Sequence, residues 1–169
     1  MLKKIVGTSV LTVALISPFG LEKPSIVSAA SCSYTQSWDL VDSGKHLDWD
    51  GSTVFMTQFK QAIPIWEEIP GGVDIRPDSV TVIEDVYVSD YSKAGTTTLA
   101  YTASNGVLKF NKTTLGAEGA STRLNVAIHE LGHAQRLDHS TSTQIMYKYA
   151  TTKTTLGSTD KSVYNCNWN

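Results

Sequence analysis

The chain has 169 residues, which is room for one domain of ordinary size. Its 14 basic and 16 acidic side chains leave a net charge of −2 and are spread along the sequence without a basic stripe. Proteins that bind nucleic acid or an anionic membrane surface usually carry such a stripe. We therefore expect neither nucleic acid nor a membrane surface as a partner.

The first 30 residues have the composition of a secretory signal peptide. Lys3 and Lys4 form a short basic start, an apolar run follows from residue 5 to residue 16, and Ser28-Ala29-Ala30 offers small residues for cleavage. The apolar run is short for a membrane span, although a retained anchor is the alternative interpretation. We expect a signal peptide at residues 1–30 and a secreted, extracellular, monomeric domain at residues 31–169.

Cys32 and Cys166 are the two cysteines of the chain and lie near the two ends of residues 31–169. Export places them where disulfides persist, so we expect a bridge between them. Closing so long a loop stabilises the fold by about 4–5 kcal/mol in the chain-entropy treatment. Two alternatives are lipoprotein-type processing at Cys32, which would leave Cys166 without its partner, and a Cys32 thiolate that binds a metal in a latent form.

Hydrophobic spacing predicts an α+β order of elements from residue 46 onward. A short strand near residues 46–49 precedes a long first helix, which starts after Asp50-Gly51-Ser52-Thr53 and which Pro64 should kink or restart near its end. Runs of β-branched and aromatic residues then predict strands at 73–75, 80–83, 86–88, 96–102 and 107–110. Asn105-Gly106 favours a tight turn between the last two. The sum is a sheet of four or five strands.

Four acidic residues lie in the turns between these strands: Asp78, Glu84, Asp85 and Asp90. Carboxylates are calcium ligands, but no loop here has the regular ligand spacing of a calcium site. Calcium is therefore a cofactor without support from the sequence, and we expect solvated turn charges. His46, a lone histidine far from the others, is left out of the functional site.

A second helix is expected after residue 120, with Ser121 or Thr122 as its cap. The residues of its core-facing stripe are Leu124, Ala127, Ile128, Leu131 and Ala134. His129 and His133 are four residues apart on this helix, so both imidazoles project from one face within reach of a single ion. The spacing predicts a metal site that faces a cleft.

A catalytic zinc ion needs three protein ligands and an open position, so the pair needs one more donor. His139 is the candidate, provided that the chain turns back after about Gln135; Asp138 and Asp160 are the alternatives. Glu130 lies about 100° round the helix from His129, close enough for a water molecule and poorly placed as a ligand. It is the candidate general base.

The run from His129 to His139, followed by Met146, resembles the metal-binding pattern of the metzincin zinc peptidases, and within them the matrixin-like group with its bacterial-type secreted members. The resemblance implies a metzincin-like α+β fold across about residues 45–165. Its features would be a mixed four- or five-stranded sheet, a long first helix and a central zinc-binding helix. It also implies that Met146 forms a methionine turn, a hydrophobic floor beneath the metal that does not bind it.

Two residues depart from the family pattern. Arg136 stands where the family has a glycine with a positive φ, a conformation that costs a non-glycine residue about 1 kcal/mol and that is enough to shift His139. Lys148 follows Tyr147 where matrixins usually have proline, which affects the shape of the pocket beside the metal. Arg136 thus affects the turn that presents the third ligand, and Lys148 affects one wall of the cleft.

The resemblance implies a zinc-dependent endopeptidase with one catalytic zinc ion, which hydrolyses peptide bonds of extracellular proteins. The peptide substrate would lie antiparallel to an edge strand within residues 96–102, in contact with Thr98, Leu99, Ala100 and Tyr101. The alternative is a secreted zinc-binding interaction module of the same fold with weak or no catalysis. Glu130 argues against that alternative, and Arg136 argues for it.

Overall fold

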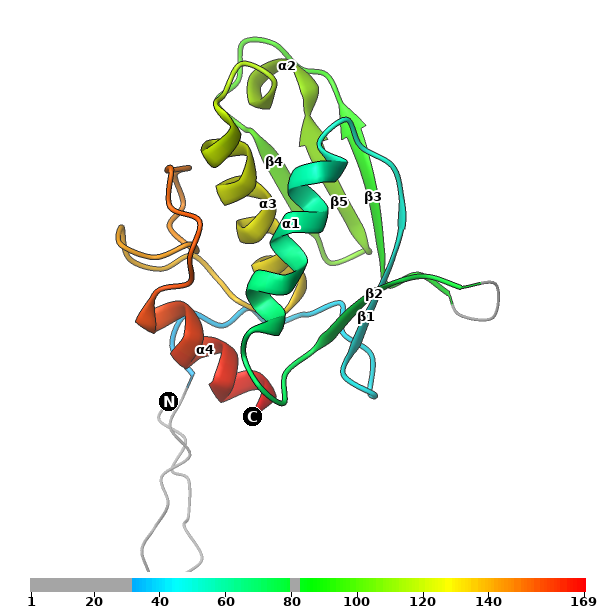
Figure 1. Ribbon diagram of the computed structural model, residues 1–169, viewed down its shortest axis with the longest axis vertical. Coiled ribbons are helices and arrows are strands. Elements are labelled where there is room, and N and C mark those ends of the chain that lie inside the picture. Colours follow the sequence, from blue (N-terminus) through cyan, green and yellow to red (C-terminus); the bar gives the residue numbers. More distant parts are fainter. Residues whose placement is uncertain (1–31, 80–82) are drawn as a thin grey trace, which may run out of the picture. The chain divides into compact units, whose positions relative to one another are not determined.

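The computed structural model of the chain describes residues 32–79 and 83–169 (Figure 1). The predicted signal peptide at residues 1–30 lies outside these ranges, as does the predicted strand at 80–83 apart from Ile83. Ile83 itself is exposed and belongs to no strand. Among the described residues, no helix is both long enough and apolar enough to cross a bilayer.

A mixed five-stranded sheet has the order β2-β1-β3-β5-β4. Its strands are β1 (His46–Gly51), β2 (Asp74–Pro77), β3 (Val86–Tyr91), β4 (Ala100–Ala103) and β5 (Val107–Asn111). The pairs β2-β1, β1-β3 and β3-β5 are parallel, whereas β4 runs antiparallel to β5 at the edge of the sheet. The predicted α+β fold with a mixed sheet is confirmed.

The predicted strand at residues 96–102 is wrong in its first half, because β4 begins only at Ala100. The buried side chain of Asn111 donates from Nδ2 to the backbone oxygens of Lys93 and Thr98, and its Oδ1 accepts from the Lys93 backbone nitrogen. The Asn111 side chain therefore bonds backbone groups of Lys93 and Thr98 that a neighbouring strand would otherwise bond. Residues 92–99 form a loop above the edge of the sheet.

Two helices, α1 (Met56–Glu67) and α3 (Ala120–Ala134), cover the same face of the sheet and pack against each other (Figure 1). Pro64 lies within α1, which continues unbroken to its end. The indole nitrogen of Trp66 on α1 donates to the backbone oxygen of Ile128 on α3 over 2.9 Å. This bond fixes the helix that carries His129 and His133 against the first helix.

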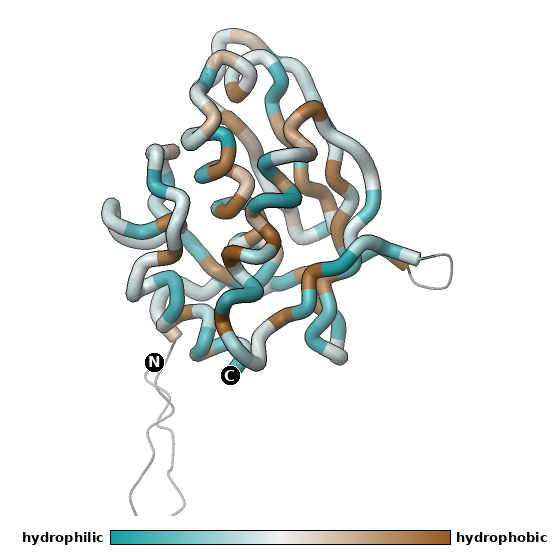
Figure 2. The backbone as a smooth tube through the Cα atoms, in the orientation of Figure 1, coloured by the Kyte–Doolittle hydropathy of each residue, from teal (hydrophilic) through white to brown (hydrophobic). Residues whose placement is uncertain are grey.

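The core lies between this helix pair and the sheet, and Figure 2 shows hydrophobic residues along both the helices and the strands. Fully buried members from the sheet, α1 and α3 include Leu47, Val88, Leu108, Phe110, Phe59, Trp66, Ile128 and Leu131. The predicted cap of α3 at Ser121 or Thr122 is wrong, because the helix begins at Ala120 with Gly119 as its N-cap. Gly119 has an extended backbone and its oxygen accepts from the Arg123 nitrogen, so the N-cap lies two residues before Ser121 and three before Thr122.

Two further helices complete the order: α2 (Lys112–Leu115), a single turn after β5, and α4 (Ser158–Trp168). The ring of Tyr164 on α4 stacks on Trp66 at 5.5 Å, and its hydroxyl accepts from the Val73 backbone nitrogen. Cys166 on α4 forms the expected disulfide with Cys32. The carboxyl-terminal helix is thus fastened both to the core and to the residues that precede β1.

Candidate metal centre

Three imidazoles converge at the end of α3. Ring centroids lie 4.6 Å apart for His129 and His133, 5.2 Å for His129 and His139, and 4.9 Å for His133 and His139. One ligand atom of each lies within 4.8 Å of the others, and the described residues contain no further group of three or more potential metal ligands. Zinc–nitrogen bonds are about 2.0–2.1 Å long, so small side-chain rotations bring these nitrogens onto one ion.

The chain leaves the helix by a tight turn that brings His139 back to the other two rings. After Ala134 ends α3, Arg136 adopts a φ of +78°, and the Leu137 nitrogen donates to the Gly132 oxygen over 3.0 Å. Arg136 therefore takes the left-handed conformation for which glycine is usually required. The expected shift of His139 away from the pair does not occur.

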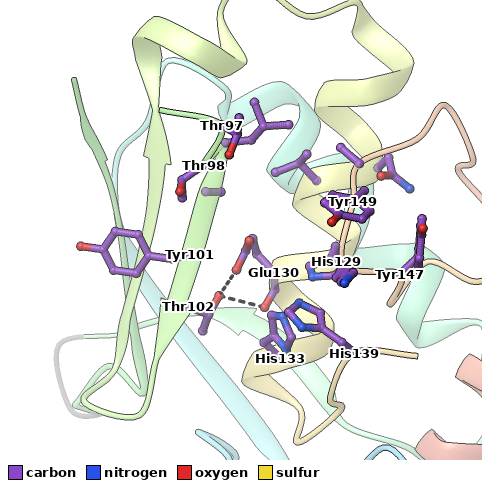
Figure 3. Close-up of a pocket in the computed structure, with 16 residues that line it drawn as sticks. Thr97, Thr98, Tyr101, Thr102, His129, Glu130, His133, His139, Tyr147 and Tyr149 are labelled. Carbon is purple, nitrogen blue, oxygen red and sulfur yellow. Dashed lines mark hydrogen bonds between the residues drawn. The ribbon is translucent and has the colours of Figure 1, made fainter. Parts of the chain in front are cut away.

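Hydrogen bonds at Nδ1 orient two of the rings. Nδ1 of His129 lies 2.9 Å from the Ile145 oxygen, and Nδ1 of His133 lies 2.9 Å from the Leu137 oxygen. A carbonyl only accepts, so these bonds place the hydrogen on Nδ1 and leave the Nε2 lone pair free. Figure 3 shows the three rings facing one another.

Burial makes the neutral form of these imidazoles the stable one. It lowers the pKa of His129 to about 3 and that of His133 to about 4, with smaller contributions of the same sign from the neighbouring histidines. Neutral imidazole is the form that binds metal ions. Three converging imidazoles, two of them held by hydrogen bonds at Nδ1, form a donor set that fits a zinc ion.

The carboxyl group of Glu130 lies in the same cleft and is almost completely buried. Oγ1 of Thr102 on β4 is 2.7 Å from Glu130 Oε2 and 3.0 Å from the Glu130 backbone oxygen (Figure 3). Burial raises the pKa of Glu130 to about 7, although the Thr102 hydrogen bond acts in the opposite direction. Thr102 is not among the site residues predicted from the sequence. Its only local signal is its position two residues after Ala100, on the same face of the edge strand.

The histidines and Glu130 lie in a cleft of about 420 Å³. Residues 97–102 form one wall, residues 147–150 the opposite wall, and α3 the floor. Among the described residues β4 pairs with β5 alone, so its outer edge borders the cleft without a strand partner. A second groove of about 650 Å³ shares Thr97, Leu99 and Ala150 with the cleft and continues it along a surface rich in threonine.

The family model described as matrixin matches residues 46–165. The chain belongs to the matrixin family. Its members are metallopeptidases, and the three-histidine cluster fits the zinc that the family uses. This chain is accordingly a zinc metallopeptidase, and the resemblance seen in the sequence is confirmed.

One solved structure shows the same fold. Myroilysin superposes with a TM-score of 0.52 at 13% sequence identity, covering 81% of this chain and 97% of that one. High choriolytic enzyme 1, a hatching-enzyme zinc protease of the medaka Oryzias latipes, gives a TM-score of 0.37 at 19% identity, covering 64% of this chain and 52% of that one. A search of curated proteins found no match.

In this matrixin, Met146 packs against α3 at Gly132 and is 1% exposed. A Cβ added to Gly132 would collide with the Met146 sulfur and with the Trp66 ring, so only glycine allows this close approach. The backbone nitrogens of Ile145 and Met146 donate to the Asp160 carboxylate over 2.8 and 3.2 Å. Asp160, in the first turn of α4, thereby holds the backbone of Ile145 and Met146 in place.

Asp138 and Asp160, the alternatives for the third metal ligand, do not belong to the cluster of His129 and His133. Asp160 is buried, and its oxygens accept from the backbone of Ile145, Met146 and Gly157, away from the imidazoles. Asp138 is exposed, and its Oδ1 accepts from the His139 nitrogen. His139 is the residue that joins the helical pair.

The four residues expected to contact substrate differ in their surroundings. Ala100 and Tyr101 belong to β4, but the Tyr101 ring points away from the histidines (Figure 3) and packs against Tyr91. Leu99 precedes the strand, and its oxygen accepts from the Asn111 nitrogen. The Thr98 oxygen accepts from Asn111 and Thr114. The backbone oxygens of Thr98 and Leu99 are thus engaged within the protein.

The remaining polar residues of the sequence analysis lie elsewhere. His46 is paired with Asp42, outside the metal cluster. Asp90 accepts from the Thr53 hydroxyl and the Val54 nitrogen, and Asp85 accepts from the Asp48 nitrogen. These two carboxylates therefore fasten turns.

Proposed function

We propose that this matrixin is a secreted, monomeric zinc endopeptidase that cleaves extracellular proteins. In this proposal His129, His133 and His139 hold the single catalytic zinc ion, and Glu130 is the general base. The observation that carries the proposal is the convergence of three imidazoles beside one buried carboxyl group in an open cleft.

Zinc, when bound, supplies a Lewis acid that polarises the scissile carbonyl group and lowers the pKa of water. The Glu130 carboxylate accepts the proton of the attacking water and passes it to the departing amine. Its pKa of about 7 in the metal-free protein, which burial raises, suits a group that both takes up and releases a proton near neutral pH. Thr102 holds the carboxyl group in one orientation while it does so.

The outer edge of β4 is the proposed binding line for the substrate backbone. An extended peptide antiparallel to Ala100–Ala103 would add a strand to the sheet and pass over the histidines along the cleft. Tyr147 and Tyr149, whose rings pack edge to face at 5.5 Å, would contact the peptide from the opposite wall. Met146 supplies the apolar floor beneath the metal ligands in this proposal.

Secretion is supported by the composition of residues 1–30 and by the disulfide, a bond typical of oxidising compartments. Expression of the full chain in a secreting host should release a protein whose amino terminus is Ser31. Amino-terminal sequencing of the medium fraction tests this directly. Retention of the intact chain in the cell membrane would contradict the signal peptide.

The enzymatic proposal is tested with the purified secreted chain. We expect one zinc per molecule by elemental analysis, a monomer by light scattering, and cleavage of casein or gelatin that a chelator abolishes. Glu130→Ala should retain zinc and lose cleavage, whereas Glu68→Ala, the same change at an exposed glutamate at the end of α1, should cleave as the wild type does.

Two results would contradict the proposal. A wild type that holds one zinc yet cuts no protein would favour the interaction module. Equal cleavage by Glu130→Ala would remove Glu130 from the reaction.

A further inference from the structure

The residues before β1 lie against the turn that follows the metal helix. We call residues 32–40 the amino-terminal arm. Thr35 forms an antiparallel bridge with Leu137, the Gln36 nitrogen donates to the Arg136 oxygen over 2.8 Å, and the Asp138 nitrogen donates to the Tyr34 oxygen over 2.7 Å. The arm thus acts as a strand partner for the turn that leads from His133 to His139.

The arm also holds the side chain of Arg136. Nε of Arg136 lies 3.4 Å from the Gln36 oxygen, and Nη1 lies 3.9 Å from Asp39 Oδ2. The left-handed backbone of Arg136 costs about 1 kcal/mol that a glycine would not incur. Contacts of both its backbone and its side chain with the arm offset that cost.

One side chain of the arm reaches a metal-site histidine. Nε2 of Gln36 lies 2.8 Å from Nδ1 of His133 and 2.7 Å from the Leu137 oxygen, which also accepts from His133 Nδ1. An amide nitrogen only donates, so with the hydrogen on His133 Nδ1 both groups donate to the same carbonyl. Gln36 then fixes the carbonyl that orients the His133 ring.

The disulfide fastens this arm to the fold. Cys32 begins the arm and is bonded to Cys166 on α4, and Asn167 Nδ2 donates to the Thr35 hydroxyl over 3.3 Å. If the predicted signal peptide is removed, the arm is the amino-terminal end of the chain, and a terminus that is not tied down frays most readily. The bond between Cys32 and Cys166 therefore keeps the arm against the turn.

We propose that the disulfide-anchored arm is part of the metal site: Gln36 is a positioning residue for His133, and the arm holds the Arg136 turn that presents His139. The inference rests on the proposed function of the three histidines as zinc ligands. In this protein the arm supplies the constraint that a glycine supplies in the family pattern. Metal affinity consequently depends on residues about 100 positions away in the sequence.

Zinc affinity is the direct measure, by competition with a chromophoric chelator at a temperature well below unfolding. Gln36→Ala, which leaves the disulfide intact, should weaken zinc binding by about tenfold, within the range for residues that orient metal ligands. It should also change the visible absorption of the cobalt-substituted protein. Gln61→Ala, the same change on the exposed side of α1, should leave both unchanged.

A double-mutant cycle tests the role of the arm at Arg136. Cys32→Ser/Cys166→Ser should weaken zinc binding by about tenfold in the wild-type background and by only about threefold in the Arg136→Gly background, because glycine adopts the turn without the arm. Equal losses in the two backgrounds would overturn the role of the arm. If the double serine variant does not fold, the same cycle is run with Asp39→Ala, which removes the Arg136 side-chain contact and keeps the disulfide; it should weaken zinc binding in the wild-type background only, and equal effects in the two backgrounds would overturn the role of the arm.

The outcomes separate this inference from the proposed function. A wild type that binds no zinc overturns both. A wild type that binds zinc, together with a Gln36→Ala variant whose zinc affinity lies within twofold of it and whose cobalt spectrum is unchanged, overturns the positioning role alone.

Discussion

The hydroxyl oxygen of Thr102 lies 2.7 Å from Oε2 of Glu130 and 3.0 Å from the backbone oxygen of the same residue. The edge strand of the sheet and the metal helix therefore meet at the proposed general base. A hydroxyl group has one hydrogen to donate, so Thr102 donates to the carboxylate or, when the carboxyl is protonated and donates to Thr102, to the backbone oxygen. Both protonation states of Glu130 have a hydrogen-bond partner.

Replacing Thr102 by valine keeps the shape of the side chain and removes this partner. Hydrogen bonds to charged groups contribute about 1.5–3 kcal/mol, so we expect Thr102→Val to lower kcat/KM by about tenfold or more. The Thr102 bond lowers the pKa of Glu130, and its loss should move the acid limb of the kcat/KM profile to higher pH. Thr102→Ser, which keeps the hydroxyl, serves as the control; a valine variant with the profile of the serine variant would argue against this coupling.

The metal-free protein should lose stability as the pH falls from about 6.5 toward 4.5. His129 and His133 have native pKa values of about 3 and 4 against 6.5 when unfolded, so the unfolded chain binds about two more protons on them in this window. Glu130 acts in the opposite direction, since its native pKa of about 7 exceeds its unfolded value of 4.5 and the folded state holds about one more proton. About one proton net gives a slope near 1.4 kcal/mol per pH unit.

Glu130→Gln removes the opposing group, so the slope for the metal-free variant should roughly double. Urea unfolding of chelator-treated wild type and Glu130→Gln at several pH values between 5 and 6 gives both slopes. Parallel curves for the two proteins would show that Glu130 does not hold its proton in the folded metal-free state.

Asp160 should contribute more to stability than its place outside the metal cluster suggests. Its buried carboxylate accepts from three backbone nitrogens, those of Ile145, Met146 and Gly157. Asp160→Ala leaves all three without this acceptor, which we expect to cost about 3 kcal/mol and to lower Tm by about 10 °C. Asp160→Asn keeps one acceptor oxygen, so its Tm in differential scanning calorimetry should lie between those of the wild type and Asp160→Ala. An alanine variant as stable as the asparagine variant would contradict this role.

The spacing of residues in the sequence predicts the site correctly where a side chain's position depends only on its near neighbours in the chain. The placement of His129 and His133 on one face follows from the helical period alone, and the apolar stripe identified which face packs inward. The return of His139 also followed from spacing, because six residues beyond His133 cannot stay on one helical face. The chain turns after Gln135 as expected.

Apart from the cap of α3, which is a local error, the errors and omissions concern partners that are distant in the sequence. The predicted strand at 96–102 is too long because Asn111, up to 18 residues later, bonds the residues that precede β4. Asp160 is a possible metal ligand from the sequence alone because its actual partner, the Ile145 backbone nitrogen, lies 15 residues away. Gln36 is 97 residues from His133, so no window of the sequence could pair them. Side-chain hydrogen bonds of this range depend on the completed packing.

Asn111 offers the sharpest test of how the cleft wall is held. Its side chain makes four hydrogen bonds, two as donor to the oxygens of Lys93 and Thr98 and two as acceptor from the nitrogens of Lys93 and Thr113. Asn111→Asp keeps the acceptor atoms but places a carboxylate oxygen against two carbonyl oxygens. We expect the loop of residues 92–99 to loosen while β5 and the metal helix keep their positions.

The kinetic consequence should appear in substrate binding, because this loop forms a wall of the cleft and does not carry the metal-site residues. For a peptide long enough to reach residues 97–99, KM should rise about three- to tenfold in Asn111→Asp with kcat nearly unchanged, whereas a short peptide should be cleaved as before. Asn105→Asp makes the same chemical change in the exposed hairpin turn and should leave both constants unchanged. Hydrogen exchange should show faster labelling of residues 92–99 in the Asn111 variant, and equal KM values for the two variants would show that Asn111 does not hold the wall.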